Sequence, residues 1–209
     1  HNKMLTFGGK DGVIQIFSGS NHSHFEHNNI SVRGYFHRPV QGVPVNRHQC
    51  ISLATQASYN RFEFNNCTTD GRGTDTNMNF LGSVVFTSAH YNNFSHNIIN
   101  ATGENITVFK IFNSNYNRIE GNTFHAQNGT YSGAILVLAF FGVADNNTFV
   151  NTTVIRAGLS QPAFTIVNKD SGFTNYFTYE TTNGKINWTS GNWSTYMNLS
   201  LGETVFVES

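Results

Sequence analysis

The sequence of 209 residues is poor in charge, proline and cysteine, and it has no long apolar run. Charged residues make up 11% of the chain, and 12 basic residues balance 12 acidic ones. A neutral chain lacks the electrostatic footprint of a nucleic-acid-binding protein, so we expect no nucleic-acid partner. The longest apolar run, Ala134 to Phe141, is eight residues long and too short for a membrane span, so we expect no membrane insertion.

The sequence also lacks the motifs of the common catalytic and metal sites. It has no nucleophile motif, no paired histidines at metal-ligand spacing and no phosphate-binding glycine loop. A glycine-rich loop around Asp70 and Asp75 has carboxylates that suit calcium, but a single loop of this kind is usually structural. We therefore predict no metal and no cofactor.

What the sequence has instead is an asparagine-rich repeat. Its pattern is an aromatic or apolar residue, Asn, any residue, an apolar residue, two variable positions, Asn, any residue and an apolar residue. The pattern occurs at Tyr91–Ile99 and Tyr116–Phe124, and more loosely at Phe141–Phe149. The central apolar residues Phe94, Ile119 and Ala144 are 25 residues apart, and repetition at such a period indicates a solenoid.

Two earlier copies, Tyr59–Cys67 and His22–Ile30, are separated by longer steps, so loops are inserted there. The many Asn and Gly residues and the short spacing of the apolar residues favour strands over helices. We expect three sets of equivalent positions: Phe25, Phe62, Phe94, Ile119 and Ala144 facing inward; Ile30, Cys67, Ile99, Phe124 and Phe149 facing inward on the next strand; and Asn28, Asn65, Asn97, Asn122 and Asn147 at the corner between them.

Asparagine suits such a corner for two reasons. It tolerates the left-handed backbone conformation that a corner needs, and its amide can bond the copies above and below. The sequence therefore predicts an asparagine ladder in a coil of parallel strands.

These coils resemble a right-handed parallel β-helix of the pectin-lyase-like kind, and with their lateral loops they look most like a bacteriophage tailspike or tail-fibre protein. The resemblance covers roughly residues 12 to 155. It implies an all-β right-handed parallel β-helix solenoid, a homotrimer, and a place in the virion tail, outside the cell. We predict parallel β-helix coils over residues 1–159, with lateral loops at 31–49 and 68–80. Residues 160–209 would form a C-terminal β cap, or an oligomerisation or tip region, because solenoids need an end cap.

The two predicted loops follow the same strand of their copies, so we expect them to lie side by side. The first contains arginine, histidine and aromatic side chains, namely Arg33, Tyr35, Phe36, His37 and Arg38, and the second contains Asp70 and Arg72. Aromatic faces stack on sugar rings and arginine binds carboxylates, which suits a glycan-binding surface. A solvated loop packed on the coil is the alternative.

Charged residues flank the inward position of each copy. The residue after it is Glu26, Glu63, Ser95, Glu120 or Asp145, and the residue before it is His24, Arg61, Asn93, Arg118 or Val143. Both sets should point outward as neighbouring acidic and basic ladders, which either only form ion pairs or line a glycan groove in which Arg61 and Arg118 contact the sugar.

Carboxylates in this groove suggest possible catalysis. Glu63 and Glu120 would lie about 10 Å apart, at the upper edge of inverting-glycosidase geometry, and Glu26 and Glu63 about 5 Å apart, in the retaining range. Glu63, Glu120 and Asp70 are the candidate catalytic residues.

Three further features carry expectations about the chain's environment. Cys67 fills an inward position, where we expect a buried thiol, with a Cys50–Cys67 disulfide as the alternative. The apolar run Ala134–Phe141 needs cover on both faces, which predicts a subunit interface or else cover from the C-terminal segment. Twelve Asn-x-Ser/Thr sequons are interpreted as a consequence of composition, and a secreted or viral glycoprotein stays open.

Three functions then compete. The first is a virion attachment protein that binds a bacterial surface polysaccharide. The second is a polysaccharide depolymerase, hydrolase or lyase, on the same scaffold. The third is a structural shaft or cap without glycan binding. Fold alone does not choose among them.

Overall fold

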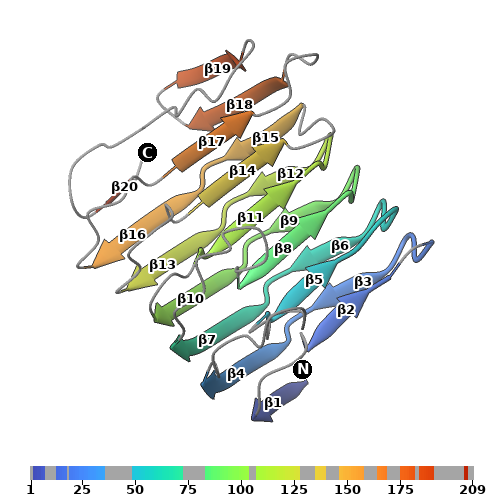
Figure 1. Ribbon diagram of the computed structural model, residues 1–209, viewed down its shortest axis with the longest axis vertical. Helices are drawn as coiled ribbons and strands as arrows, with labels where there is room; N and C mark the ends of the chain where they lie inside the picture. The colour runs from blue at the N-terminus through green and yellow to red at the C-terminus, as the bar shows by residue number, and fades with distance from the viewer. Residues whose placement is uncertain are drawn as a thin grey trace, which may run out of the picture.

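The structure is a computed structural model that describes residues 2–7, 13–17, 19–35, 49–72, 83–103, 107–127, 135–139, 146–157, 164–168, 175–181, 184–190 and 205–206. Every regular element in this part of the chain is a β-strand (Figure 1). The strands form three sheets, which we name sheets A, B and C. The all-β prediction is therefore confirmed for these residues.

The three sheets have seven, six and seven strands. Sheet A contains β1 (Lys3–Phe7), β4 (Asn29–Tyr35), β7 (Asn66–Arg72), β10 (Ile98–Gly103), β13 (Thr123–Gln127), β16 (Thr153–Ala157) and β20 (Val205–Phe206). Sheet B contains β2 (Ile14–Ile16), β5 (Ile51–Leu53), β8 (Val84–Thr87), β11 (Phe109–Phe112), β14 (Ile135–Ala139) and β17 (Phe164–Asn168). Sheet C contains β3 (His24–Glu26), β6 (Arg61–Glu63), β9 (Asn93–Ser95), β12 (Arg118–Glu120), β15 (Asn147–Val150), β18 (Asn175–Thr181) and β19 (Gly184–Ser190).

Each turn of the chain contributes one strand to each sheet. The chain passes through sheets A, B and C in the same order from β1 to β18 (Figure 1). Each strand from β1 to β15 pairs in parallel with its equivalent in the next turn. The arrangement is consistent with a β-helix-like solenoid. Parallel pairing continues past residue 159 through β17 and β18, and the domain boundary at that residue stays a prediction.

Antiparallel pairing in the described part of the chain involves its last two strands. β19 returns along β18 as an antiparallel hairpin, in which Thr181 pairs with Gly184. β20 pairs with β16 at the end of sheet A.

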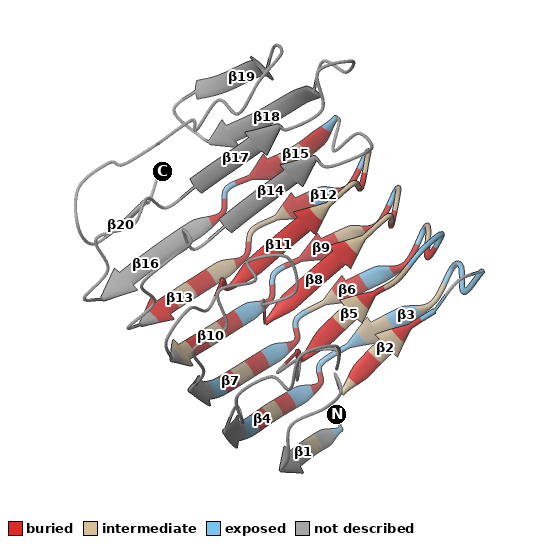
Figure 2. Ribbon diagram, in the orientation of Figure 1, coloured by how far each residue is buried: buried red, intermediate tan, exposed pale blue. Residues whose placement is uncertain are grey.

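The core lies between the three sheets, because one apolar cluster contains inward side chains from all of them. Ile30 and Cys67 come from sheet A, Ile51 from sheet B, and Phe62 and Phe94 from sheet C. Buried and exposed residues alternate along many of these short strands, as the colours in Figure 2 show. The predicted inward positions from Phe62 to Ile119 in sheet C, and from Ile30 to Phe124 in sheet A, are confirmed.

The predicted asparagine ladder is confirmed for Asn28, Asn65, Asn97 and Asn122. The Nδ2 of Asn65 donates to Oδ1 of Asn97 at 3.0 Å, and that of Asn97 donates to Oδ1 of Asn122 at 3.1 Å. The same oxygens accept backbone N–H groups, as from Asn65 to Asn97 at 2.8 Å. The second amide proton goes to a main-chain carbonyl of the preceding turn, for example from Asn97 to Phe62. The carboxamides of Asn65 and Asn97 are therefore fully hydrogen-bonded.

A second ladder runs along the corner between sheets B and C, and it was not predicted. Asn60 donates to Asn92, Asn92 to Asn117, and Asn117 to Asn147, at 3.1, 3.1 and 3.0 Å. Asn147 thus belongs to this second ladder, and its assignment to the first was wrong. The signal was present in the sequence as the Asn that follows each aromatic residue, such as Tyr91 or Tyr116.

The register of the last copy was also wrong. Ile119 pairs with Phe149, so the step is 30 residues and not 25, and Ala144 is not the equivalent residue. Thr148 and Val150 replace the predicted Val143 and Asp145 beside Arg118 and Glu120. The sequence Asp145-Asn146-Asn147 imitates Glu120-Gly121-Asn122, which hid an insertion of five residues (30 − 25). The predicted Ala144, Asp145 and Val143 lie outside the described residues.

The left-handed residue at each corner is the one before the ladder asparagine, not the asparagine itself as predicted. Tyr59, Phe64, Tyr91 and His96 have φ between 54° and 59°. A left-handed conformation costs a side chain roughly 1–2 kcal/mol. The ladder hydrogen bonds of the next residue offset this cost, and they require a carboxamide in a fixed position.

Both predicted loops begin later than expected. β4 continues to Tyr35 and β7 to Arg72, and the two strands pair in register from Asn29↔Asn66 to Tyr35↔Arg72. The first five residues of each predicted loop are therefore strand. Residues 36–48 and 73–80 lie outside the described residues, and Gln49, the last residue of the first predicted loop, is buried.

The expectation of a buried thiol at Cys67 was wrong, because Cys67 forms a disulfide with Cys50. Cys50 directly precedes β5 and Cys67 lies in β7, and both are fully buried in the core cluster. The bridge crosses the core within one turn of the solenoid, from sheet B to sheet A. Disulfides of this kind persist in oxidising compartments.

The outer face of sheet B is covered within a single chain at β8 and β11. Val85 and Lys110 alternate with core residues and are register partners, yet they are 3% and 0% exposed. The two strands are buried over most of their length in Figure 2. The predicted subunit interface at Ala134–Phe141 is untested. This run contains β14, the neighbour of β11 in sheet B, and the side chains of β14 are outside the described set.

Stability should depend on pH through Lys110. Burial disfavours the charged ammonium and lowers the pKa of Lys110 from 10.5 to about 7. The unfolded chain keeps this proton up to about pH 10.4, so unfolding takes up a proton between these values and stability rises with pH across the window. We expect the free energy of unfolding in urea to increase by roughly 2–3 kcal/mol from pH 7 to pH 9.5. Lys110→Met should flatten this rise; an equal rise in the variant would assign it to other groups.

Candidate binding face

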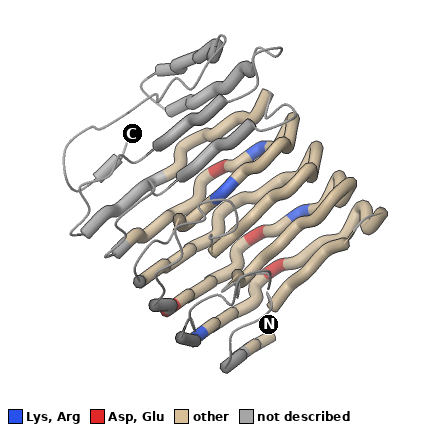
Figure 3. The backbone as a smooth tube through the Cα atoms, in the orientation of Figure 1, with Lys and Arg blue, Asp and Glu red and all other residues tan. Residues whose placement is uncertain are grey.

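The outer face of sheet C carries the polar side chains that flank each buried residue. Its four N-terminal strands are only three residues long, so the middle side chain points inward and the outer two point out. We name the outward residues the sheet C strip: His24, Glu26, Arg61, Glu63, Asn93, Ser95, Arg118 and Glu120. Charged residues are sparse along the described chain as a whole (Figure 3).

The arginine–glutamate ion pairs of the strip form within a strand. Arg61 Nη2 lies 2.8 Å from Glu63 Oε1, and Arg118 Nε lies 2.8 Å from Glu120 Oε2. The arginine side chains are more than half exposed, so each pair contributes at most about 1 kcal/mol to stability. The expected acidic and basic rows are confirmed up to Glu120 and end there, because Val150 follows in the next turn.

Both carboxylates are held in the ionised form. The hydrogen bond from Arg61 lowers the pKa of Glu63, and partial burial opposes it. The charge of Arg61 and hydrogen bonds with Ser95 and His24 lower the pKa further, so the net shift is downward. The hydrogen bond from Arg118 likewise lowers the pKa of Glu120. A glycosidase needs one carboxyl group with a raised pKa to act as general acid. The ionised carboxylates of the strip therefore suit a role as hydrogen-bond acceptors in binding better than a role as general acid.

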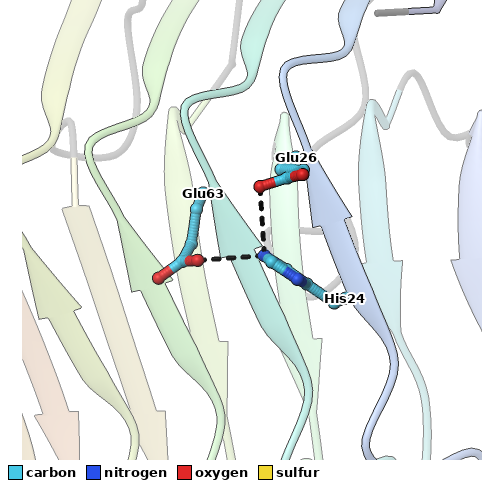
Figure 4. Close-up of side chains that lie close together, drawn as sticks. All are labelled: His24, Glu26 and Glu63. Carbon is cyan, nitrogen blue, oxygen red and sulfur yellow. Dashed lines mark hydrogen bonds and ion pairs between the residues drawn. The ribbon is translucent and has the colours of Figure 1, made fainter.

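Three side chains converge at the N-terminal edge of the strip. His24 and Glu26 are two residues apart on β3, and Glu63 is the register partner of Glu26 on β6. His24 Nε2 lies 2.9 Å from Glu63 Oε2 and 3.7 Å from Glu26 Oε2, so one imidazole lies between two carboxylates (Figure 4). The neighbouring positions of Glu26 and Glu63 agree with the spacing expected from the sequence.

Exposed rings line both sides of the strip. On one side His22, Tyr59, Tyr91 and Tyr116 stack with centroids 5.3, 5.1 and 4.8 Å apart, and the three tyrosines are about half exposed. We name this row the tyrosine ladder. On the other side His27, Phe64 and His96 stack at 5.2 and 5.1 Å. His96 continues over Gly121, where a Cβ would lie 2.9 Å from the imidazole ring.

Neither row of rings was predicted as a surface feature. The tyrosines are the first residue of the repeat pattern, so their recurrence was visible in the sequence. What hid their role was the backbone: a residue with positive φ directs its side chain away from the core at the corner. Repetition at one corner then stacks the rings turn upon turn.

No family model, curated protein or solved structure matches this chain. The described residues contain no helix that is long and apolar enough to cross a membrane.

The structure separates the other predicted site residues from the strip. Arg33 and Asp70 are exposed register partners on sheet A, so Asp70 does not cluster with Glu63 and Glu120 on sheet C. Tyr35 and Arg72 are also register partners on sheet A, at the ends of β4 and β7. Their side chains lie outside the described set, as do residues Phe36, His37 and Arg38.

Proposed function

We propose that this chain is an attachment protein that binds an extended polysaccharide along the sheet C strip. The observation that carries the proposal is the composition of the strip: a floor of arginine and carboxylate side chains between two rows of exposed rings. The strip repeats with the strand spacing of about 4.8 Å. Such a repeat suits a linear polymer, which presents hydroxyl groups at regular intervals.

Hydrogen bonding, rather than ring stacking, would supply the contacts. The rings of the tyrosine ladder lie face to face, at 7° and 1° between planes, so their edges and not their faces are available to a ligand. Tyrosine hydroxyls both donate and accept hydrogen bonds. A guanidinium has five N–H donors, and an ion pair with a single carboxylate oxygen leaves some of them available to a ligand. Arginine would also pair with the carboxylates of an acidic sugar.

The finer form of the proposal is a right-handed parallel β-helix of a phage tailspike-like protein. Support for the hand comes from the parallel strands of each sheet, since crossover connections between parallel neighbours are right-handed in about 98% of cases. The buried disulfide suits an extracellular location such as a virion tail. The partner would be a bacterial surface polysaccharide, and the assembly a homotrimer.

Binding without cleavage is the expected outcome. The pKa values of Glu63 and Glu120 are lowered by their arginine partners, so both lack the proton that hydrolysis would need from a general acid. We therefore rank the depolymerase below the binding protein. A purely structural shaft predicts no glycan binding at all.

Screening of the purified chain against acidic and neutral bacterial polysaccharides tests the proposal. Arg61→Ala and Tyr91→Ala should each weaken binding about tenfold, the effect of losing one well-placed polar contact of about 1.4 kcal/mol. Arg33→Ala distinguishes the two faces, because Arg33 is an exposed arginine on sheet A. If Arg33→Ala weakens binding and Arg61→Ala does not, the ligand lies on sheet A and the strip is not the site. A reducing-end assay on the same samples would detect cleavage.

A further inference from the structure

We infer that His24, Glu26 and Glu63 form a divalent-cation site that prefers zinc. The three residues supply one imidazole nitrogen and two carboxylate oxygens, a donor set that zinc commonly takes. All three ligand atoms lie within 4.8 Å of one another. This inference concerns the metal alone and does not depend on polysaccharide binding.

The spacing of the donor atoms fits tetrahedral zinc. With metal–ligand bonds of about 2.0–2.2 Å, neighbouring ligand atoms of a tetrahedral site lie about 3.4 Å apart. His24 Nε2 is 2.9 Å from one carboxylate oxygen and 3.7 Å from the other, on either side of this value. Shifts of a few tenths of an ångström at His24, and rotation of the exposed Glu26 side chain, would complete the triangle.

The backbone fixes the three ligands on one surface. His24 and Glu26 alternate with Phe25 on β3, so both point outward, and the parallel register places Glu63 beside Glu26. Figure 4 shows the imidazole of His24 between the two carboxylates. Strands of a sheet hold such positions more precisely than loops do.

Residues outside the three ligands orient Glu63. Its Oε1 accepts hydrogen bonds from Arg61 at 2.8 Å and from the hydroxyl of Ser95 at 3.2 Å, which leaves Oε2 directed at His24. Hydrogen bonds to the second oxygen of a ligating carboxylate fix its direction and are typical of zinc sites. The two carboxylates balance the charge of a divalent cation.

The equivalent positions in later turns do not repeat this donor set. Arg61, Asn93 and Arg118 follow His24 along the strip, and Ser95 lies between Glu63 and Glu120. Guanidinium groups do not ligate metals. The site is thus specific to the first two turns, and three protein ligands leave a fourth position for water or a ligand oxygen, as in catalytic zinc sites.

Calorimetric titration of the full chain with zinc chloride at neutral pH is the test. We expect one ion per chain, and substitution with cobalt(II) should give the visible absorption of a four-coordinate site. His24→Ala and Glu26→Gln should each weaken zinc binding more than about 100-fold, because each removes a direct ligand. Binding should also weaken at acid pH, since zinc requires a neutral imidazole.

His125→Ala is the matched control, because His125 lies on β13 of sheet A, away from the site. It should leave the affinity unchanged. Circular dichroism would establish that the variants keep the fold of the unmodified chain. If no zinc binds, or if His24→Ala and His125→Ala weaken binding equally, the ion is held by scattered surface histidines and the inference is wrong.

Discussion

Replacing Asn65 with alanine should lower the free energy of unfolding by about 3–5 kcal/mol. The side chain of Asn65 accepts from the backbone N–H and the amide of Asn28, and it donates to Asn97 and to the carbonyl of Phe25. Truncation leaves three buried polar groups without a partner, each costing about 1–3 kcal/mol. Urea unfolding monitored by circular dichroism measures the difference.

Asn66 is the natural control, because it is the next residue along the chain and is exposed. Asn66→Ala should change stability by less than about 0.5 kcal/mol. Equal effects of the two substitutions would show that the loss of stability comes from the backbone preference of asparagine and not from the ladder hydrogen bonds. An unchanged Asn65→Ala variant would mean that the ladder contributes nothing to stability.

Phe109→Ala should destabilise the chain by about 3–5 kcal/mol. Phe109 is fully buried, and its ring contacts Phe86, Phe94, Phe124 and Phe149 at centroid distances between 5.2 and 6.1 Å. These neighbours come from all three sheets, so the cavity left by truncation opens where the sheets meet. Backbone pairing on both sides of β11 limits how far the cavity can collapse.

The same measurement on Phe17→Ala provides the comparison. Phe17 is 63% exposed, so its loss should change the free energy of unfolding by less than about 0.5 kcal/mol. A small effect at Phe109 would indicate that neighbouring rings move into the vacated space. In that case a crystal structure of the variant should show the side chains of Phe86 or Phe124 displaced.

The sequence predicted the parallel strands and the first ladder because these depend on short-range repetition. Asn65 and Asn97 recur in a fixed relation to inward residues such as Phe62 and Phe94, and that relation survives insertions elsewhere. The last copy was misplaced because chain length, not local pattern, decides the register there. A five-residue insertion between Phe124 and Phe149 cannot be located when Asp145-Asn146-Asn147 imitates the expected motif.

The candidate site was predictable in part. The outward positions of Glu63, Arg61, Glu120 and Arg118 follow from the alternation of a strand, and the structure agrees. Their pairing within a strand depends on side-chain rotamers, which the sequence does not specify. The disulfide could not be predicted for a similar reason. Cys50 lies outside the repeat pattern, so its closeness to Cys67 depends on the three-dimensional path of the chain between them.

The first ladder also gives the molecule a polarity. Asn2 donates to Asn28, and each later carboxamide donates toward the next turn through Asn65 and Asn97 to Asn122. Aligned amide dipoles polarise one another, so the bonds strengthen cooperatively. The two ends of the row are chemically unlike, because the row begins with the carboxamide oxygen of Asn2 and ends with the carboxamide N–H groups of Asn122. The ladder itself can therefore be lengthened or shortened only by whole turns of one orientation, whereas the segments between its asparagines vary in length.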